Sequence, residues 1–96
     1  MKGNTLGEFM DDLLTMGGPE KEFTFNGKMY MLETYYDHDN ESYEMVIVEF
    51  SSPEEPCVFR CKRETLEECV KAFERATIFD GKTIYEAERE ITVLWG

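Results

Sequence analysis

The sequence has no long hydrophobic run and no apolar core of a secretory signal. Residues 1–12, MKGNTLGEFMDD, already carry acidic side chains, and no stretch reaches the roughly 20 apolar residues that a membrane-spanning helix requires. The three cysteines, an odd number, fit a reducing compartment better than a disulfide scaffold. We therefore expect a cytoplasmic protein with no membrane partner.

Basic side chains are also scarce. The chain has 10 lysines and arginines against 21 aspartates and glutamates, which gives a formal net charge of -11 at pH 7. A field of this sign repels nucleic-acid phosphates and anionic membrane surfaces. The composition therefore argues against direct nucleic-acid binding and favours a basic protein surface as partner, although an acidic surface also serves solubility.

The motifs of common enzymes are missing. No serine lies in a Gly-x-Ser-x-Gly elbow, and no glycine-rich phosphate loop is present. The only histidine, His38, lies in a polar segment apart from Cys57, Cys61 and Cys69, so no cysteine has a marked base. We predict no catalytic residue and a protein that is not an enzyme.

The histidine and the cysteines form a nominal Cys₃His zinc set, but their spacing opposes it. Cys57 and Cys61 are about 13 Å apart along a strand, whereas tetrahedral zinc ligands lie within about 4 Å of one another. We predict no metal site and no cofactor.

The carboxylates of residues 37–41 alternate in a way that suits hard cations. Asp37, Asp39 and Glu41 supply oxygen ligands, yet the EF-hand positions that require glycine and glutamate hold Ser42 and Val48. We expect a solvated hairpin tip with at most weak, millimolar Ca²⁺ binding.

The sequence does contain enough apolar material for one core. At 96 residues, of which 42% are hydrophobic and 14% aromatic, it matches the size of a globular domain. No linker, low-complexity tract or repeat divides it. We expect a single domain over residues 1–96.

Three capping boxes predict helix starts. In each, a threonine is followed three residues later by a glutamate: Thr5 with Glu8, Thr65 with Glu68, and Thr83 with Glu86. The first opens a helix over residues 6–16, and the second opens a helix whose apolar stripe includes Phe73. The third predicts a short helix through about residue 90, and the alternative there is a hairpin turn at Asp80-Gly81.

The dipeptide Asn26-Gly27 predicts a type I′ turn between two strands. A two-residue turn fixes the register, so we expect Phe25 to pair with Lys28 and Phe23 with Tyr30. Further strands are predicted over 43–50, 57–61 and 91–95, with the first of them central because it is apolar on both faces. On 57–61, the alternation predicts Cys57, Phe59 and Cys61 on one face. The predicted core comprises Phe23, Phe25, Tyr30, Leu32, Val46, Val48 and Phe73.

Together these elements predict an α+β fold. We expect a mostly antiparallel four- to five-stranded meander sheet, packed by an N-terminal helix and one or two C-terminal helices.

One stretch stands out by its charge. No lysine or arginine occurs from Met29 to Phe59, while acidic residues recur there with tyrosines among them. We predict that these charges stand unopposed and form a docking surface on which tyrosines supply contact area. The predicted partner-binding residues are Glu33, Tyr35, Asp37, Asp39, Glu41, Tyr43 and Glu44. The alternative is a face kept acidic for solubility and edge protection.

The leading hypothesis is a non-enzymatic interaction or inhibitor module that binds a basic protein through the acidic sheet face. A special case is a nucleic-acid mimic, since carboxylates at alternate strand positions stand about 6.6 Å apart. Two further hypotheses remain open. One is a small-molecule or metal-binding module, or a minor enzyme, with a pocket between helix and sheet. The other is a structural subunit with Met29, Met31 and Trp95 at an oligomer interface.

Overall fold

The computed structural model describes residues 1–14, 20–50 and 57–95. The chain forms an α+β fold with a five-stranded antiparallel sheet. The elements are α1 (Leu6–Leu13), β1 (Lys21–Phe25), β2 (Lys28–Asp37), β3 (Ser42–Glu49), β4 (Cys57–Arg63), α2 (Leu66–Arg75), α3 (Ile84–Ala87), the 3₁₀ helix η1 (Glu88–Glu90) and β5 (Ile91–Trp95).

The strands follow the order β4-β3-β2-β1-β5. The first four form the predicted meander, and β5 adds antiparallel to the free side of β1. The Asn26-Gly27 turn sets the predicted register, with Phe25 opposite Lys28 and Phe23 opposite Tyr30. Both turn residues have positive φ, as a type I′ turn requires.

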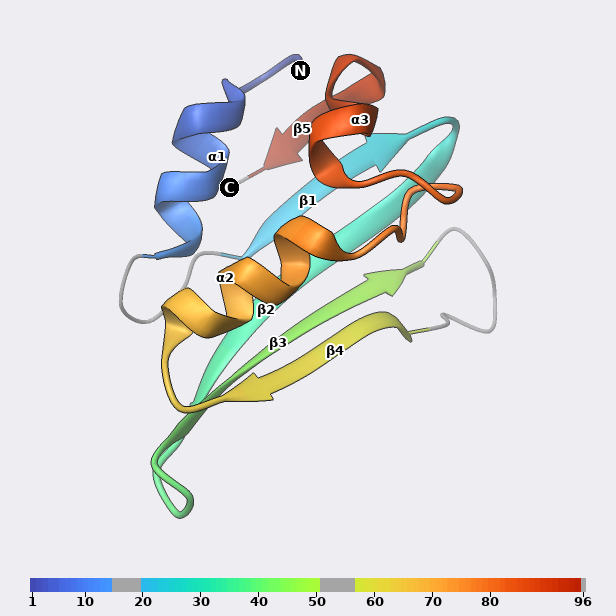
Figure 1. Cartoon of the computed structure of the whole chain (residues 1–96). Coiled ribbons are helices and arrows are strands. Elements are labelled where there is room, and N and C mark those ends of the chain that lie inside the picture. Colours follow the sequence, from blue (N-terminus) through green and yellow to red (C-terminus); the bar gives the residue numbers. More distant parts are fainter. Residues whose placement is uncertain (15–19, 51–56, 96) are drawn as a thin grey trace.

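All three α-helices lie on one face of the sheet (Figure 1). The side chains of Thr5, Thr65 and Thr83 each accept the backbone N–H three residues ahead. Among the described bonds, the reciprocal bond of a full capping box, from the backbone N–H to the glutamate, is present at Thr83 and Glu86. The first helix is described to Leu13, and residues 15 and 16 of its predicted span lie outside the described residues. In the described part of the chain, no helix is long and apolar enough to cross a membrane.

The segment before β5 contains both of the predicted alternatives, a tight turn at Asp80-Gly81 and a short helix that begins after Thr83. Asp80 and Gly81 have positive φ and form a tight turn that pairs Phe79 with Lys82. The Thr83 capping box then starts α3, which continues into η1. The Asp80 carboxylate also accepts bonds from Lys28 Nζ (2.6 Å) and Asn26 Nδ2 (3.0 Å), so the two tight turns are held together.

The core is an aromatic cluster between the helices and the sheet. Phe79, which lies between α2 and α3, has its ring centroid 5.4 Å from that of Phe25, 5.7 Å from that of Tyr30 and 6.4 Å from that of Phe73. Phe9 of α1 packs edge-on against Phe23 at 5.7 Å. Rings from α1, α2, β1 and β2 therefore meet in one buried layer.

A lysine lies inside this layer. Lys21 continues the buried alternation of β1, and its side chain is fully buried. Its Nζ is 2.9 Å from Asp12 Oδ2 of α1 and 5.0 Å from the centre of the Phe9 ring. The ammonium thus links α1 to β1, with its charge compensated by the carboxylate and the ring face.

Two sequence predictions about faces are wrong. Met45 and Ile47 of β3 enter the core, while Val46 and Val48 lie half-buried on the face without helices. The reason is register: β3 places Ile47 opposite the buried Leu32, so its odd-numbered residues share the core face. In β4, an irregularity in the pairing places Cys57 opposite Val48 and Phe59 opposite Ile47, so Cys57 is exposed while Cys61 is buried.

The remaining predicted core residues are buried, which gives a direct test of the packing. We expect Phe73→Ala to lower the free energy of unfolding by about 3–5 kcal/mol, because the fully buried ring contacts Phe9, Phe59 and Phe79. Denaturant unfolding measures this. The matched control Tyr85→Ala, at a half-exposed ring, should cost less than about 1 kcal/mol. Equal costs for the two variants would contradict the packing.

Candidate functional site: an acidic hairpin end

Most of the predicted site residues gather at one end of the β2–β3 hairpin. We call residues 35–44 the hairpin end; it comprises the last residues of β2, the connection 38–41 and the first residues of β3. This hairpin extends past the neighbouring strands and forms a projection at one end of the molecule (Figure 1). Of the seven predicted residues, only Glu33 lies outside the hairpin end, two residues before Tyr35 on β2.

The tip is held in one conformation by Asp37. Its Oδ1 accepts the backbone N–H groups of Asp39 (3.0 Å) and Asn40 (3.2 Å), and its Oδ2 accepts Asn40 Nδ2 (2.8 Å). Glu41 then adopts φ of 49°, which completes the turn. These hydrogen bonds therefore favour one shape of the tip.

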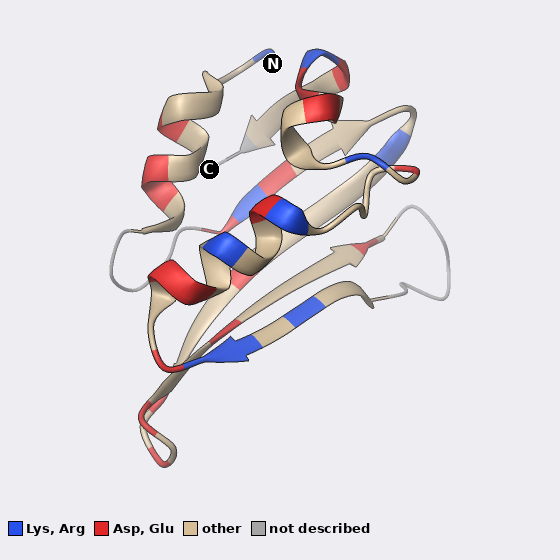
Figure 2. Cartoon of the chain, in the orientation of Figure 1, with Lys and Arg blue, Asp and Glu red and all other residues tan. Residues whose placement is uncertain are grey.

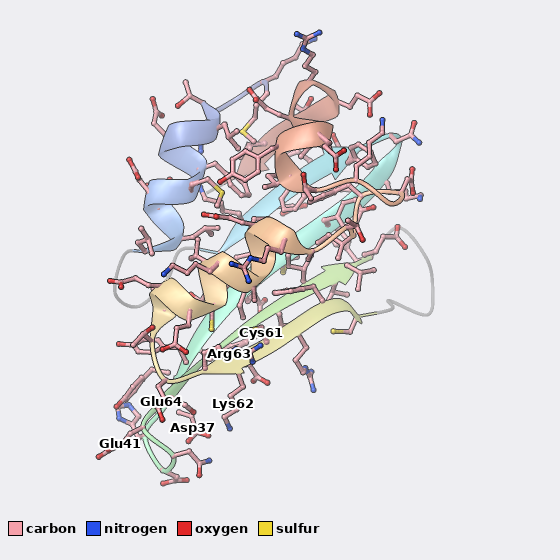
Figure 3. All side chains as sticks on the ribbon, viewed as in Figure 1. Asp37, Glu41, Cys61, Lys62, Arg63 and Glu64 are labelled. Atoms are coloured by element: carbon pink, nitrogen blue, oxygen red, sulfur yellow. The ribbon has the colours of Figure 1, made fainter. Side chains whose placement is uncertain are left out.

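Cations from β4 oppose part of the acidic charge. Lys62 Nζ donates to Asp37 Oδ2 at 2.8 Å, and Figure 3 shows these two side chains next to each other. Arg60 Nε lies 3.8 Å from Glu44 Oε2. The prediction of an unopposed acidic stretch is therefore wrong for Asp37 and Glu44, because β4 pairs with β3 and places its own cations beside them.

The contact with Lys62 shifts the titration of both partners. The Lys62 ammonium, followed by the Asn40 amide, holds the pKa of the Asp37 carboxyl well below its usual range. The same hydrogen bond raises the pKa of Lys62. Asp37 is thus a structural carboxylate that anchors the tip to the β4 edge, and this role removes it from the set of free acidic groups.

Three predicted carboxylates remain available. Within the described residues, no ion pair involves Glu33, Asp39 or Glu41. Asp39 and Glu41 are exposed at the tip, and Glu33 is half-buried on the sheet face without helices. These groups carry the charge that the hairpin can offer to another molecule.

The tyrosines lie on two different faces. Tyr35 pairs with Glu44 on the face without helices and is 48% exposed. Tyr43 pairs with Tyr36 on the helix side and packs against the core, so it does not share a face with Glu33 and Tyr35 as predicted. Tyr36, which the prediction left out, is 43% exposed. Its ring centroid lies 4.9 Å from that of Tyr43 and 4.8 Å from that of His38.

The residues considered for metal and thiol chemistry do not form one site in the described part of the chain. Among the described residues, no group of three or more His, Cys, Asp or Glu side chains is placed to hold a metal ion. Cys61 and Cys69 are buried together, with Cys69 Sγ 3.9 Å from the Cys61 carbonyl oxygen. Burial, reinforced by Cys61, raises the pKa of the Cys69 thiol to about 11, so it is not a thiolate at neutral pH.

A depression of about 370 Å³ lies beside the base of the hairpin end. Its lining is mixed in charge and comprises Asn40, Ser42, Lys62, Arg63, Glu64 and Glu68. Because this lining contains two cations and two carboxylates, it favours neither a positively nor a negatively charged ligand. We therefore place the candidate site at the hairpin end and not in this depression.

The acidic residues are not confined to the sheet. Figure 2 shows acidic positions along α1, α2 and the α3 region as well as at the hairpin end. A partner that sensed only net charge would therefore have several surfaces to choose from. What distinguishes the hairpin end is the combination of free carboxylates, exposed tyrosines and a fixed projecting shape.

Comparison of the sequence with protein-family models and with curated proteins, and of the fold with solved structures, found no match. The function is therefore argued from the chain itself.

The Asp37 anchor predicts a pH-dependent contribution to stability. Its pKa is lowered in the folded state, so the stabilisation is fully present above the unfolded value of about 3.9 and is lost as the pH falls through the lowered folded value. Asp37→Asn should therefore lower the melting temperature at neutral pH, and the difference from wild type should shrink below about pH 4. Asp39→Asn, at a carboxylate without an ion pair, is the control and should change the melting temperature little. A constant Asp37→Asn difference across this range would contradict the anchor.

Proposed function

We propose that the protein is a non-enzymatic interaction module that binds a basic segment of another protein at the hairpin end. The observation that carries the proposal is the pairing of unopposed carboxylates with exposed tyrosines on one rigid projection. Asp39 and Glu41 steer and hold cations, and Tyr35 and Tyr36 offer ring faces for contact area and cation–π interactions. Three free thiols fit action in a reducing compartment such as the cytoplasm.

The β4 cations limit the shape of the partner. Arg60 and Lys62 lie next to the acidic residues of β3 and β2 on the sheet face without helices. A broad basic surface laid flat over that face would meet these two positive charges. A narrow lysine- or arginine-rich segment that approaches the tip meets Asp39 and Glu41 first, so we propose an extended or helical basic segment as the ligand.

The arrangement supports docking of a basic segment better than nucleic-acid mimicry. A mimic requires a row of free carboxylates, but Tyr35 stands between Glu33 and Asp37 along β2, and Asp37 is neutralised by Lys62. The free groups instead lie on both sides of the tyrosines along the chain, with Glu33 before them and Asp39 and Glu41 after them. Such separated carboxylates fit single cationic side chains.

Binding of an arginine-rich peptide tests the site. We expect Asp39→Lys/Glu41→Lys to weaken binding at least about fivefold at 0.15 M salt, mainly through a slower on-rate, because both steering charges are reversed. Tyr35→Ala should act mainly through a faster off-rate, because it removes contact area and leaves the charge unchanged. Association kinetics over a salt series measure both effects.

The matched control reverses two exposed acids of α1. Glu8→Lys/Asp11→Lys makes the same change in net charge and should weaken binding less than about twofold. Tyr85→Ala is the corresponding control for Tyr35→Ala. Equal weakening by the two double variants would show that the peptide senses only net charge, and the proposal would then fail.

A further inference from the structure

The backbone of β2 directs its hydrogen-bonding groups to β3 and to β1 in alternation. In an antiparallel ladder, each residue directs its N–H and its C=O to one neighbouring strand, and the next residue directs them to the other. The N–H of Phe50 donates to the Met29 carbonyl at 2.9 Å, so the odd-numbered residues of β2 bond to β3. The even-numbered residues, from Lys28 to Tyr36, therefore point towards the side on which β1 lies.

Strand β1 occupies only the first part of this side. Its register with β2 ends where Lys21 pairs with Leu32, and Figure 1 shows β2 continuing past the start of β1. Among the described residues, no strand pairs with the backbone N–H and C=O groups of Thr34 and Tyr36 on this side. We call residues 33–37 of β2, seen from this side, the free edge.

The outer strands of the sheet, β4 and β5, suit a basic segment less well. At β5, the N–H of Lys2 donates to the Ile91 carbonyl (3.0 Å), and the Lys2 carbonyl accepts the N–H of Val93 (2.8 Å). At β4, every charged residue is basic, and the Lys62 carbonyl accepts Arg63 Nη1 at 2.9 Å. The free edge carries no lysine or arginine, and β3 separates it from the cations of β4. Its charge and its open backbone groups both favour a basic strand.

We propose that the basic ligand binds as an extended segment that adds to the free edge as a further strand, in line with β1. The proposal rests on the proposed function, because it takes from it the basic ligand and the position at the hairpin end. It adds the binding mode: the main chain of the ligand bonds to the backbone groups of Thr34 and Tyr36. The ligand is therefore an arginine- or lysine-rich segment that becomes extended, and a basic helix is excluded.

The side chains along the free edge match such a ligand. Glu33 and Tyr35 lie on the sheet face without helices, so a ligand residue directly opposite either of them places its side chain on that face. An arginine there meets the carboxylate of Glu33 and the 48% exposed ring of Tyr35. A longer segment also reaches the tip, where Asp39 and Glu41 are exposed.

Alternate N-methylation of a peptide tests the strand addition. The probe is a peptide of alternating arginine and valine at about 0.15 M salt, with two isomers that carry N-methyl groups either on the valine or on the arginine nitrogens. The isomers have equal charge, but in a paired strand only one set of nitrogens faces the protein. One isomer should bind about tenfold more weakly than the parent peptide, because it loses the main-chain hydrogen bonds, and the other should bind within about twofold.

Hydrogen exchange of individual amides locates the added strand on the full chain. In the free protein, the amides of Thr34 and Tyr36 should exchange faster than those of Glu33 and Tyr35, which are bonded to β3. Saturation with the parent peptide should slow the amides of Thr34 and Tyr36 at least about tenfold more than those of Glu33 and Tyr35.

The possible outcomes separate strand addition from the proposed function. If the parent peptide does not bind, the proposed function fails and the strand addition fails with it. If the parent peptide binds and its two isomers bind alike, docking at the hairpin end stands and the strand addition is overturned. If the amides of Thr34 and Tyr36 already exchange as slowly as their neighbours in the free protein, the edge is occupied by the chain itself, which also overturns the strand addition.

Discussion

The large aromatic rings that β1 and β2 contribute to the core all project from the same face of the sheet, and the rest of the structure depends on this one-sided packing. Phe23, Phe25 and Tyr30 supply the rings of the sheet, and Phe9, Phe73 and Phe79 cover them from the helices and the connection before α3. Three helices of four to ten residues bury this layer, and all three lie on this one face of the sheet. The opposite face is left to methionine, valine and charged side chains, and none of these helices covers it.

The charges follow from the same constraint. Because β2 and β3 are longer than β1, their ends extend beyond the packed layer, and polar residues occupy this projection. Asp37 turns the projection into a fixed tip through its bonds to Asn40 and Lys62. The pairing with Lys62 neutralises the Asp37 carboxylate. The same bonds hold the segment that carries Asp39, Glu41 and the exposed tyrosines. The carboxylate that stabilises the tip and the carboxylates proposed to bind a ligand are thus different residues of one short segment.

The sequence predicted what local chemistry decides. The Asn26-Gly27 turn, the three threonine caps and the alternation of β1 and β2 gave the α+β fold and the first hairpin register, because each signal lies within a few residues. The face of β3 was wrong because Met45 to Val48 is apolar at every position, so alternation carries no information there. The ion pairs of Asp37 and Glu44 were missed because their cations come from β4, beyond the window in which charge was counted. The burial of Lys21 could have been predicted from the sequence, since residues 21, 23 and 25 alternate onto the same face of β1.

The central claim is that the two faces of the sheet are unequal, one buried beneath the helices and one without helices. A soluble paramagnetic probe tests it directly by methyl NMR on dilute protein. The methyl groups of Val46 and Val48 should lose intensity, while those of Met45 and Ile47 should be protected. The reverse pattern would mean that β3 is shifted by one residue, which would move Glu44 to the buried side and contradict the described hairpin end.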